Sequence, residues 1–303
     1  MALTHLRALP PALLLAVACN PSPQRTSAAT ATPAQTTLTL ATASDQWVTV
    51  GDLRLRYREI GEGPPVVLLH GYTDNLAMWN GPADSLARDH RVIVPDLRGF
   101  GESSKSGDPG FYGQQMVDDV VRLLDHLNLP DAHLIGYSMG GIISANVAVR
   151  YPARVRTVTF AAGAFFQDSA ETRSVMAYAE RLANGEGLAP FFKWILPTWP
   201  DSMITAILPS LVAQNDSGSL VASIRGFMPL QLDSLAIDQS RIPATSVVSE
   251  TDPRAKGARF LVRHWPGKQL VVLPRGDHAD IHLAPELLEA FRAQERRVLA
   301  AGR

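Results

Sequence analysis

The chain has 303 residues, of which 46% are hydrophobic and 19% are charged, and its formal net charge is -1. This length and composition predict one or two globular domains with a large buried core. Because basic residues are neither in excess nor clustered, nucleic acid is excluded as an expected partner.

The first 19 residues differ in composition from the rest of the chain. They read MALTHLRALPPALLLAVAC, with one arginine before a short apolar run that ends at the only cysteine, Cys19. A membrane-spanning helix needs ~20 apolar residues, so this shorter run predicts a secretory signal peptide over residues 1–19. The tetrapeptide AVAC is similar to the cleavage box of bacterial lipoproteins, whose cysteine is lipidated, and ordinary cleavage nearby is the alternative. We therefore expect an exported protein that is periplasmic, secreted, or held at a bacterial membrane by a lipid on Cys19.

Residues 20–44 are predicted to form a flexible linker. They begin with NPSPQRTSAATATPAQTT, which has too few large apolar side chains to offset the entropy lost on ordering. If Cys19 is lipidated or removed, the folded part has no thiol. That excludes a cysteine nucleophile and a cysteine metal site.

Strands and helices are expected to alternate from residue 45 onward. QWVTVGDLRLRYREIG reads as a hairpin around Gly51-Asp52, and the spacing of apolar residues in VDDVVRLLDHLNL predicts a helix. Short apolar runs predict buried strands. These runs are PPVVLLHG, HRVIVPD, DAHLIGYS, VRTVTFAA, ATSVVSE and KQLVVLP. The alternation predicts an α/β fold in which residues 45–166 and 241–303 form a doubly wound, mostly parallel sheet.

Residues 167–240 interrupt this alternation with several short helical segments, and we interpret them as a helical cap over one edge of the sheet. The prolines expected to separate the helices are Pro197, Pro200, Pro209 and Pro229. Most aromatic side chains here are expected to form the small core of the cap itself. Phe191, Trp194 and Phe227 are candidates to line an apolar substrate pocket.

A G-x-S-x-G sequence, Gly136 to Gly140, lies between a predicted strand and a predicted helix. A serine in this position projects from a sharp, strained turn, and glycines on both sides avoid side-chain collisions. The turn places the Ser138 hydroxyl at a helix N-terminus, which favours negative charge, and directs the Met139 N–H toward the same space. This context predicts a nucleophilic Ser138 and an oxyanion donor at Met139.

A serine hydroxyl needs a base, and two histidines follow the last predicted strand in PRGDHADIHLAP. We predict His278 as the base, with His282 as the alternative. His90 and His133 are expected at surface positions. His70, at the end of a strand, is expected to orient the backbone.

The base needs a carboxylate that fixes its tautomer. Asp252 follows a predicted strand at its carboxyl end, where open parallel sheets gather functional groups. We predict Asp252 in this role, and the alternatives are Glu250, Asp277 and Asp280.

The second oxyanion donor is expected in LLHGYTDN, at an early junction between strand and loop. There Gly71 allows a turn that directs the Tyr72 N–H inward.

Taken together, HGYTDN, DLRGFGES, GYSMGG and GDHADIHLAPE resemble the motifs of the α/β-hydrolase fold superfamily, in the same order. The resemblance covers roughly residues 47–292, and the helical insertion corresponds to the cap of that family. It implies Ser138 as nucleophile, Asp252 as acid and His278 as base, with no metal or organic cofactor. HExxH, CxxC and dinucleotide glycine motifs are absent from the sequence. In one departure, Ser249 stands where the family often has glycine, three residues before the acid.

The serine nucleophile narrows the implied reaction, because family members that cleave epoxides or carbon–halogen bonds carry a carboxylate there. The resemblance implies hydrolysis of a carboxylic ester through an acyl-enzyme. The apolar cap favours a small to medium apolar acyl or aryl substrate. The enzymatic alternatives are a carbon–carbon bond hydrolase of aromatic ring-cleavage products, a lactonase and a perhydrolase. The non-enzymatic alternative is a ligand-binding module that kept the fold without turnover.

Overall fold

The computed structural model describes residues 38–51, 53–163, 169–230, 232 and 234–302. The fold starts before the predicted boundary at residue 45, because Leu40 is fully buried. The Leu40 N–H donates to Asp84 Oδ1 (2.7 Å), and Arg58 Nη1 donates to the Leu40 carbonyl (3.0 Å). Leu40 and Ala43 supply the apolar surface that the Pro/Ser/Thr-rich stretch lacks, so residues 38–44 are packed rather than flexible. The predicted signal, Cys19 and linker residues 20–37 lie outside the described residues.

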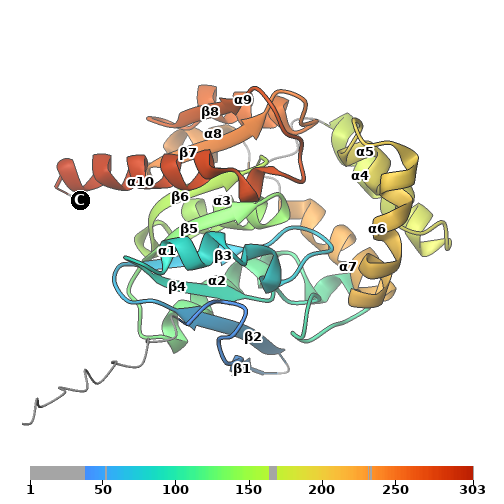
Figure 1. Cartoon of the computed structure of the whole chain (residues 1–303), viewed down its shortest axis with the longest axis horizontal. Helices are drawn as coiled ribbons and strands as arrows, with labels where there is room; N and C mark the ends of the chain where they lie inside the picture. The colour runs from blue at the N-terminus through green and yellow to red at the C-terminus, as the bar shows by residue number, and fades with distance from the viewer. Residues whose placement is uncertain (1–37, 52, 164–168, 231, 233, 303) are drawn as a thin grey trace, which may run out of the picture. The chain divides into compact units, whose positions relative to one another are not determined.

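Eight strands form one sheet in the order β1-β2-β4-β3-β5-β6-β7-β8 (Figure 1). The strands are β1 (Gln46–Val50), β2 (Leu53–Ile60), β3 (Pro65–Leu69), β4 (Arg91–Pro95), β5 (Ala132–Tyr137), β6 (Val155–Ala161), β7 (Ala244–Ser249) and β8 (Gln269–Leu273). Strand β2 pairs antiparallel with β1 and β4, and all other neighbours are parallel. The predicted mostly parallel sheet is confirmed.

Helices cover both faces of the sheet. The core helices are α1 (Pro82–Leu86), α2 (Gln114–His126), α3 (Met139–Arg150), α9 (Ala255–His264) and α10 (Pro285–Ala300). Short 3-10 turns are η1 (Leu76–Trp79), η2 (Pro109–Phe111), η3 (Pro152–Arg154) and η5 (Ile281–Leu283). In β3, Val67 and Leu69 share a core with α2 and α3, whereas Val66 and Leu68 share another with α1 and α10. Alternate residues thus enter opposite cores, as in a strand buried on both faces.

The insertion forms α4 (Ser169–Ala183), α5 (Ala189–Ile195), α6 (Asp201–Gln214), α7 (Ser217–Phe227), η4 (Met228–Leu230) and α8 (Ser234–Gln239). Figure 1 shows α4 to α7 gathered on one side of the sheet, away from the C-terminal end of α10. We call α4 to α7 the cap. Helix α8 packs against α9 instead, with Ile237 fully buried in the core, so the cap ends before the predicted residue 240.

Pro209 was expected to help break up the insertion, but α6 continues through it over the segment that the sequence indicated as helical. A proline in a helix interior removes one backbone hydrogen bond and costs about 3 kcal/mol. Helix α6 also packs against α5, and Ile204 at its start is buried.

Candidate active site

Ser138 stands at the sharp turn between β5 and α3, with φ 49° and ψ -107°. Residues other than glycine rarely adopt a positive φ, so this backbone is strained. A Cβ on Gly136 would lie 2.2 Å from the Gly140 carbonyl oxygen, and one on Gly140 would lie 2.2 Å from that of Leu69. A side chain at either position would collide with the backbone, so both positions require glycine. This is the steric reason for which the G-x-S-x-G pattern predicts the turn.

Three of the predicted side chains lie in one hydrogen-bonded line. His278 Nε2 is 3.0 Å from Ser138 Oγ, and His278 Nδ1 is 3.0 Å from Asp252 Oδ2 and 3.1 Å from Oδ1. Asp252 is 3% exposed and His278 4%, so water competes little for these bonds. The loops after β5, β7 and β8 supply the three residues at the carboxyl edge of the sheet. This geometry allows proton transfer from the hydroxyl to an imidazole whose other nitrogen faces a carboxylate.

None of the alternative residues occupies these positions. His282 packs its ring against Tyr137, at 5.3 Å between centroids, rather than against Ser138. Asp277 accepts a hydrogen bond from the indole N–H of Trp199 in the cap. Glu250 and Asp280 are exposed at the surface.

The loop that carries His278 is tied to the loop that carries Asp252. The hydroxyls of Ser249 and Thr251 both donate to the Gly276 carbonyl, at 2.6 and 2.8 Å. The Tyr137 hydroxyl donates to the His278 carbonyl at 2.9 Å. Ser249, the one departure from the family pattern, thus supplies a hydrogen bond between the two loops.

Tyr72 and Met139, the predicted oxyanion residues, line one cavity together with Ser138. Met139 is the first residue of α3, and the Tyr72 and Met139 N–H groups donate to no other residue that the structure describes. His70 is buried, its Nε2 accepts from the Leu97 N–H (2.9 Å), and its Nδ1 is 2.8 Å from the Gly71 carbonyl. In a planar trans peptide, the Gly71 carbonyl and the Tyr72 N–H point in opposite directions. These contacts fix the peptide that carries the Tyr72 N–H, in keeping with the backbone-orienting role predicted for His70.

Ser138 lies between two cavities. The smaller, of about 20 Å³, is lined by Tyr72, Ser138, Met139, Ile142, Val175, Phe191, Trp194, Ile195, Ile224, Phe227 and Arg254. It contains all three aromatic residues expected to line a pocket. Arg254 is 5% exposed and pairs with Glu171 at 3.2 Å. Burial lowers the pKa of Arg254, and Glu171 and Asp252 oppose that effect.

The larger cavity, of about 450 Å³, contains Ser138 and His278 and opens between the sheet edge and the cap. It is lined by Tyr72, Thr73, Asp74, Tyr137, Phe191, Phe192, Ile195, Leu196, Trp199, Ala206, Ile207, Ser210, Leu211, Ala279 and His282 as well. Asp74 was missed by the sequence analysis, although it follows the predicted oxyanion residue by two positions.

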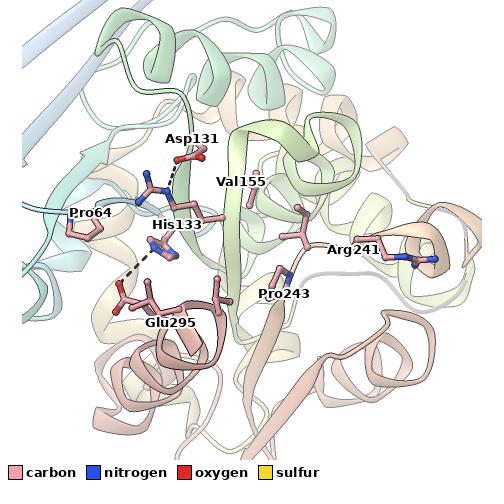
Figure 2. Close-up of a pocket in the computed structure, with 11 residues that line it drawn as sticks. Pro64, Asp131, His133, Val155, Arg241, Pro243 and Glu295 are labelled. Atoms are coloured by element: carbon pink, nitrogen blue, oxygen red, sulfur yellow. Dashed lines mark hydrogen bonds and ion pairs between the residues drawn. The ribbon is translucent and has the colours of Figure 1, made fainter. Parts of the chain in front are cut away.

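A separate cavity of about 470 Å³ lies at the amino ends of β3, β5 and β6 (Figure 2). It contains His133, which pairs with Glu295 at 3.8 Å and with Thr157 Oγ1 at 2.8 Å. His90 Nε2 is 3.0 Å from the same carboxylate. His90 and His133 are 2% and 4% exposed, so their predicted surface positions are wrong. Internal hydrogen-bond partners compensate their burial, which lowers the pKa of His133 to about 4.

In the part of the chain that the structure describes, no three His, Cys, Asp or Glu side chains come together in a way that could hold a metal ion. Within the same residues, no helix is both long and apolar enough to cross a membrane.

Comparisons with known proteins identify the fold. Residues 64–182 match the family model described as the alpha/beta hydrolase fold. The chain is 38% identical to the dihydrolipoyllysine-residue acetyltransferase component of the acetoin cleaving system of Pseudomonas putida over 143 residues. The aligned region covers 46% of this chain and 38% of that protein. The chain is 32% identical over 145 residues to 2-hydroxymuconate semialdehyde hydrolase of Pseudomonas sp. (strain CF600), over 46% of this chain and 51% of that protein. The chain thus spans about half or less of the length of these relatives.

A solved structure aligns over much more of the chain. The thermophilic esterase from Thermogutta terrifontis (malate bound) has a TM-score of 0.70 and 27% sequence identity, over 84% of this chain and 99% of that chain. The alignment is long enough to include the sheet and part of the insertion, so the likeness concerns the whole architecture rather than a single motif.

Proposed function

Since this chain belongs to the α/β-hydrolase fold superfamily, we propose that it is a serine hydrolase that cleaves carboxylic esters of small to medium apolar acyl or aryl groups. The contact line from Ser138 through His278 to Asp252 carries this proposal. An imidazole held between a hydroxyl and a buried carboxylate is the arrangement that activates a serine.

In the proposed mechanism, His278 takes the proton of the Ser138 hydroxyl as its oxygen attacks the ester carbonyl carbon. The Tyr72 and Met139 N–H groups hold the resulting oxyanion. His278 then gives the proton to the departing alcohol oxygen, which leaves an acyl-enzyme on Ser138. Water, deprotonated by His278, attacks the acyl-enzyme, and His278 returns this proton to Ser138 Oγ as the acid leaves. Asp252 holds the imidazole in the required tautomer throughout.

The two cavities indicate where each half of the ester binds. Because His278 must protonate the departing oxygen, the alcohol or aryl part should occupy the larger cavity, which contains His278. The acyl part should then lie in the smaller cavity, of about 20 Å³. A cavity holds one water-sized group when its accessible volume is roughly 10–15 Å³. The smaller cavity therefore has room for a group of about the size of a methyl. We infer a preference for short acyl groups such as acetyl.

Replacement of Ser138 tests the mechanism. Ser138→Ala should lower kcat for p-nitrophenyl acetate at least about ten-thousand-fold and abolish labelling by a fluorophosphonate. Ser202→Ala is the matched control, because Ser202 is exposed and lines neither of the two cavities beside Ser138. Persistent hydrolysis by Ser138→Ala, at the rate of the control, would refute the proposal. Retained ligand binding with no turnover in the wild-type protein would favour a binding module instead.

A carbon–carbon bond hydrolase is the second candidate, and its support is the likeness to 2-hydroxymuconate semialdehyde hydrolase. Turnover of a ring-cleavage dienoate faster than of any p-nitrophenyl ester would favour it. The same assay with a lactone, or with acetate and hydrogen peroxide, tests the lactonase and perhydrolase alternatives.

We also propose that residues 1–19 direct export and that Cys19 carries a lipid anchor, on the basis of the AVAC sequence. An alkyne-tagged fatty acid fed to a bacterial host should label the wild-type protein in the membrane fraction. Cys19→Ser should abolish that labelling without changing esterase activity. A wild-type protein that is exported without label would support an ordinary signal instead.

A further inference from the structure

The larger cavity beside Ser138 has one carboxyl group in an otherwise mostly apolar wall. Its cap side is lined by Phe191, Phe192, Ile195, Leu196, Trp199, Ala206, Ile207, Ser210 and Leu211. Asp74 lines the cavity from the loop that follows the proposed oxyanion residue, Tyr72. No lysine or arginine is among the described residues that line it.

The Asp74 carboxyl group has no hydrogen-bond or ion-pair partner among the residues that the structure describes, and the residue is half-buried, so it is open to the contents of the cavity. Two buried carboxylates, Asp96 and Asp119, have partners within the protein instead. Asp96 accepts from the Leu76 and Glu102 N–H groups at 2.7 Å, and Asp119 binds the Arg98 guanidinium at 2.6 Å. A ligand that fills the cavity displaces water from the Asp74 carboxyl group, so a ligand that supplies a hydrogen bond there is favoured over one that does not.

Asp74 lines the same cavity as Ser138 and His278, next to Gly71 and Tyr137. A Cβ added to Gly71 would lie 3.1 Å from Asp74 Oδ2 and 2.6 Å from the Tyr137 ring. Asp74 and Tyr137 thus both lie next to Gly71. Thr73, between Tyr72 and Asp74, has a φ of 69°, which β-branched residues rarely adopt. The Thr73 carbonyl accepts from Asn215 at the end of α6, at 2.9 Å. The position of Asp74 is therefore determined by both the sheet and the cap.

We propose that Asp74 is a recognition residue for the alcohol part of the substrate, which carries a hydroxyl or amino group that donates a hydrogen bond to this carboxyl group. The inference rests on the proposed function, because only a departing alcohol has to enter the cavity that contains His278. The substrate class is then a short-chain ester, such as an acetate, of a larger, mainly apolar alcohol with a second polar group. A site that binds a substrate hydroxyl discriminates strongly against analogues that lack it.

Titration of Asp74 gives this recognition a pH dependence. Burial raises the pKa of Asp74 to about 7. Among the other titratable groups that line the cavity, burial raises the pKa values of Tyr72 and Tyr137 well above 10 and lowers that of His282. Tyr72, Tyr137 and His282 are therefore neutral near pH 7. Because His278 acts on every substrate in the same way, its effect cancels when two substrates are compared. Above pH 7, Asp74 only accepts hydrogen bonds, whereas its protonated form can also donate one to an ether oxygen.

Matched esters test the inference. The substrates are the monoacetates of straight-chain diols from 1,2-ethanediol to 1,6-hexanediol and the same acetates with the free hydroxyl methylated. At pH 8, we expect kcat/KM of the wild-type protein to be about tenfold or more higher for at least one diol monoacetate than for its methyl ether. In Asp74→Leu, that ratio should fall to about one. Glu62→Leu, at an exposed position outside the cavity, should keep the wild-type ratio.

The pH profile provides the second measurement. The ratio of the wild-type protein should rise as the pH increases through about 7, while Asp74→Asn, whose amide does not titrate, should show a flat profile. Equal ratios for the wild-type protein and both Asp74 variants, with acetates still hydrolysed, would overturn the role of Asp74 alone. Failure of the wild-type protein to hydrolyse any acetate would instead overturn the proposed function.

Discussion

The two ends of the sheet each join a hydroxyl, an imidazole and a carboxylate, but only one end has the surroundings of a nucleophile. At the carboxyl end these groups belong to the proposed triad. At the amino end, His133 Nδ1 lies 2.8 Å from Thr157 Oγ1, and its Nε2 lies 3.8 Å from Glu295 (Figure 2). Both sets are largely buried. Residue types and contacts alone therefore do not distinguish them.

The difference lies in the backbone around the hydroxyl. Ser138 projects from a strained turn at the start of a helix and lines a cavity together with Tyr72 and Met139, the proposed oxyanion residues. Thr157 lies within β6, directly opposite His133 on β5, and its hydroxyl is fully buried in the sheet. A developing oxyanion would find donors at the first site and only a strand ladder at the second. The comparison indicates that the turn, more than the trio of side chains, makes a serine reactive.

Removing the charge of each carboxylate should separate the two sets most clearly. Asp252→Asn leaves the geometry nearly intact but allows the wrong imidazole tautomer, so kcat for p-nitrophenyl acetate should fall about ten-thousand-fold. Glu295→Gln is the matched change at the amino end, and activity should stay within about threefold of the wild-type value. A comparable loss in both variants would show that the amino-end set influences catalysis and would break the comparison.

Distortion of the turn should have the next largest effect. In Gly140→Ala, the new Cβ would lie 2.2 Å from the Leu69 carbonyl oxygen and 2.8 Å from that of His70. The start of α3 must shift, which should lower kcat at least about a hundredfold and the free energy of unfolding by about 1–3 kcal/mol. Gly107→Ala is the control, because its Cβ would meet nothing within 4 Å. Unchanged kinetics with a normal melting temperature would show that the turn tolerates the side chain.

The amino-end set should affect stability in acid rather than catalysis. Burial lowers the pKa of His133 to about 4, below the 6.5 of an exposed histidine. The unfolded chain then binds the extra proton first, so the free energy of unfolding should fall as the pH drops from 6.5 to 4, by about 3 kcal/mol from this group. His133→Asn, which does not titrate, should lose correspondingly less in urea titrations at pH 7 and pH 4. Parallel losses in both proteins would assign the acid sensitivity to other groups.

Local constraints explain which features could be predicted from the sequence. The turn at Ser138 depends on collisions within five residues, so G-x-S-x-G was sufficient to predict it. Asp252 and His278 follow the last two strands, and a parallel sheet brings such strand ends to one edge. The order of strands and helices was predictable for the same reason, since buried strands and amphipathic helices have distinct apolar patterns.

The features that were missed depend on distant parts of the chain. His133 is buried on an interior strand, and the groups that its imidazole contacts, Thr157 on β6 and Glu295 on α10, lie far along the chain, so no local pattern encodes them. Asp74 matters only because the cap helices α5 and α6 complete the cavity over it. Leu40 was predicted to belong to the linker because it directly follows residues 20–37, which are rich in Pro, Ser, Thr and Ala. Its apolar side chain is nevertheless buried in the core.

A last difference between the two ends is that only the carboxyl end is closed by the cap. The Trp199 indole N–H donates to Asp277, the neighbour of His278, and so joins the cap to the loop of the proposed base. Trp199→Phe removes this donor and should raise KM for p-nitrophenyl acetate about 3- to 10-fold with kcat within about twofold. Trp47→Phe on β1, where the ring packs under Arg54, should change neither constant. A fall in kcat without a change in KM would instead indicate that the bond positions His278 for catalysis rather than holding the cap over the bound ester.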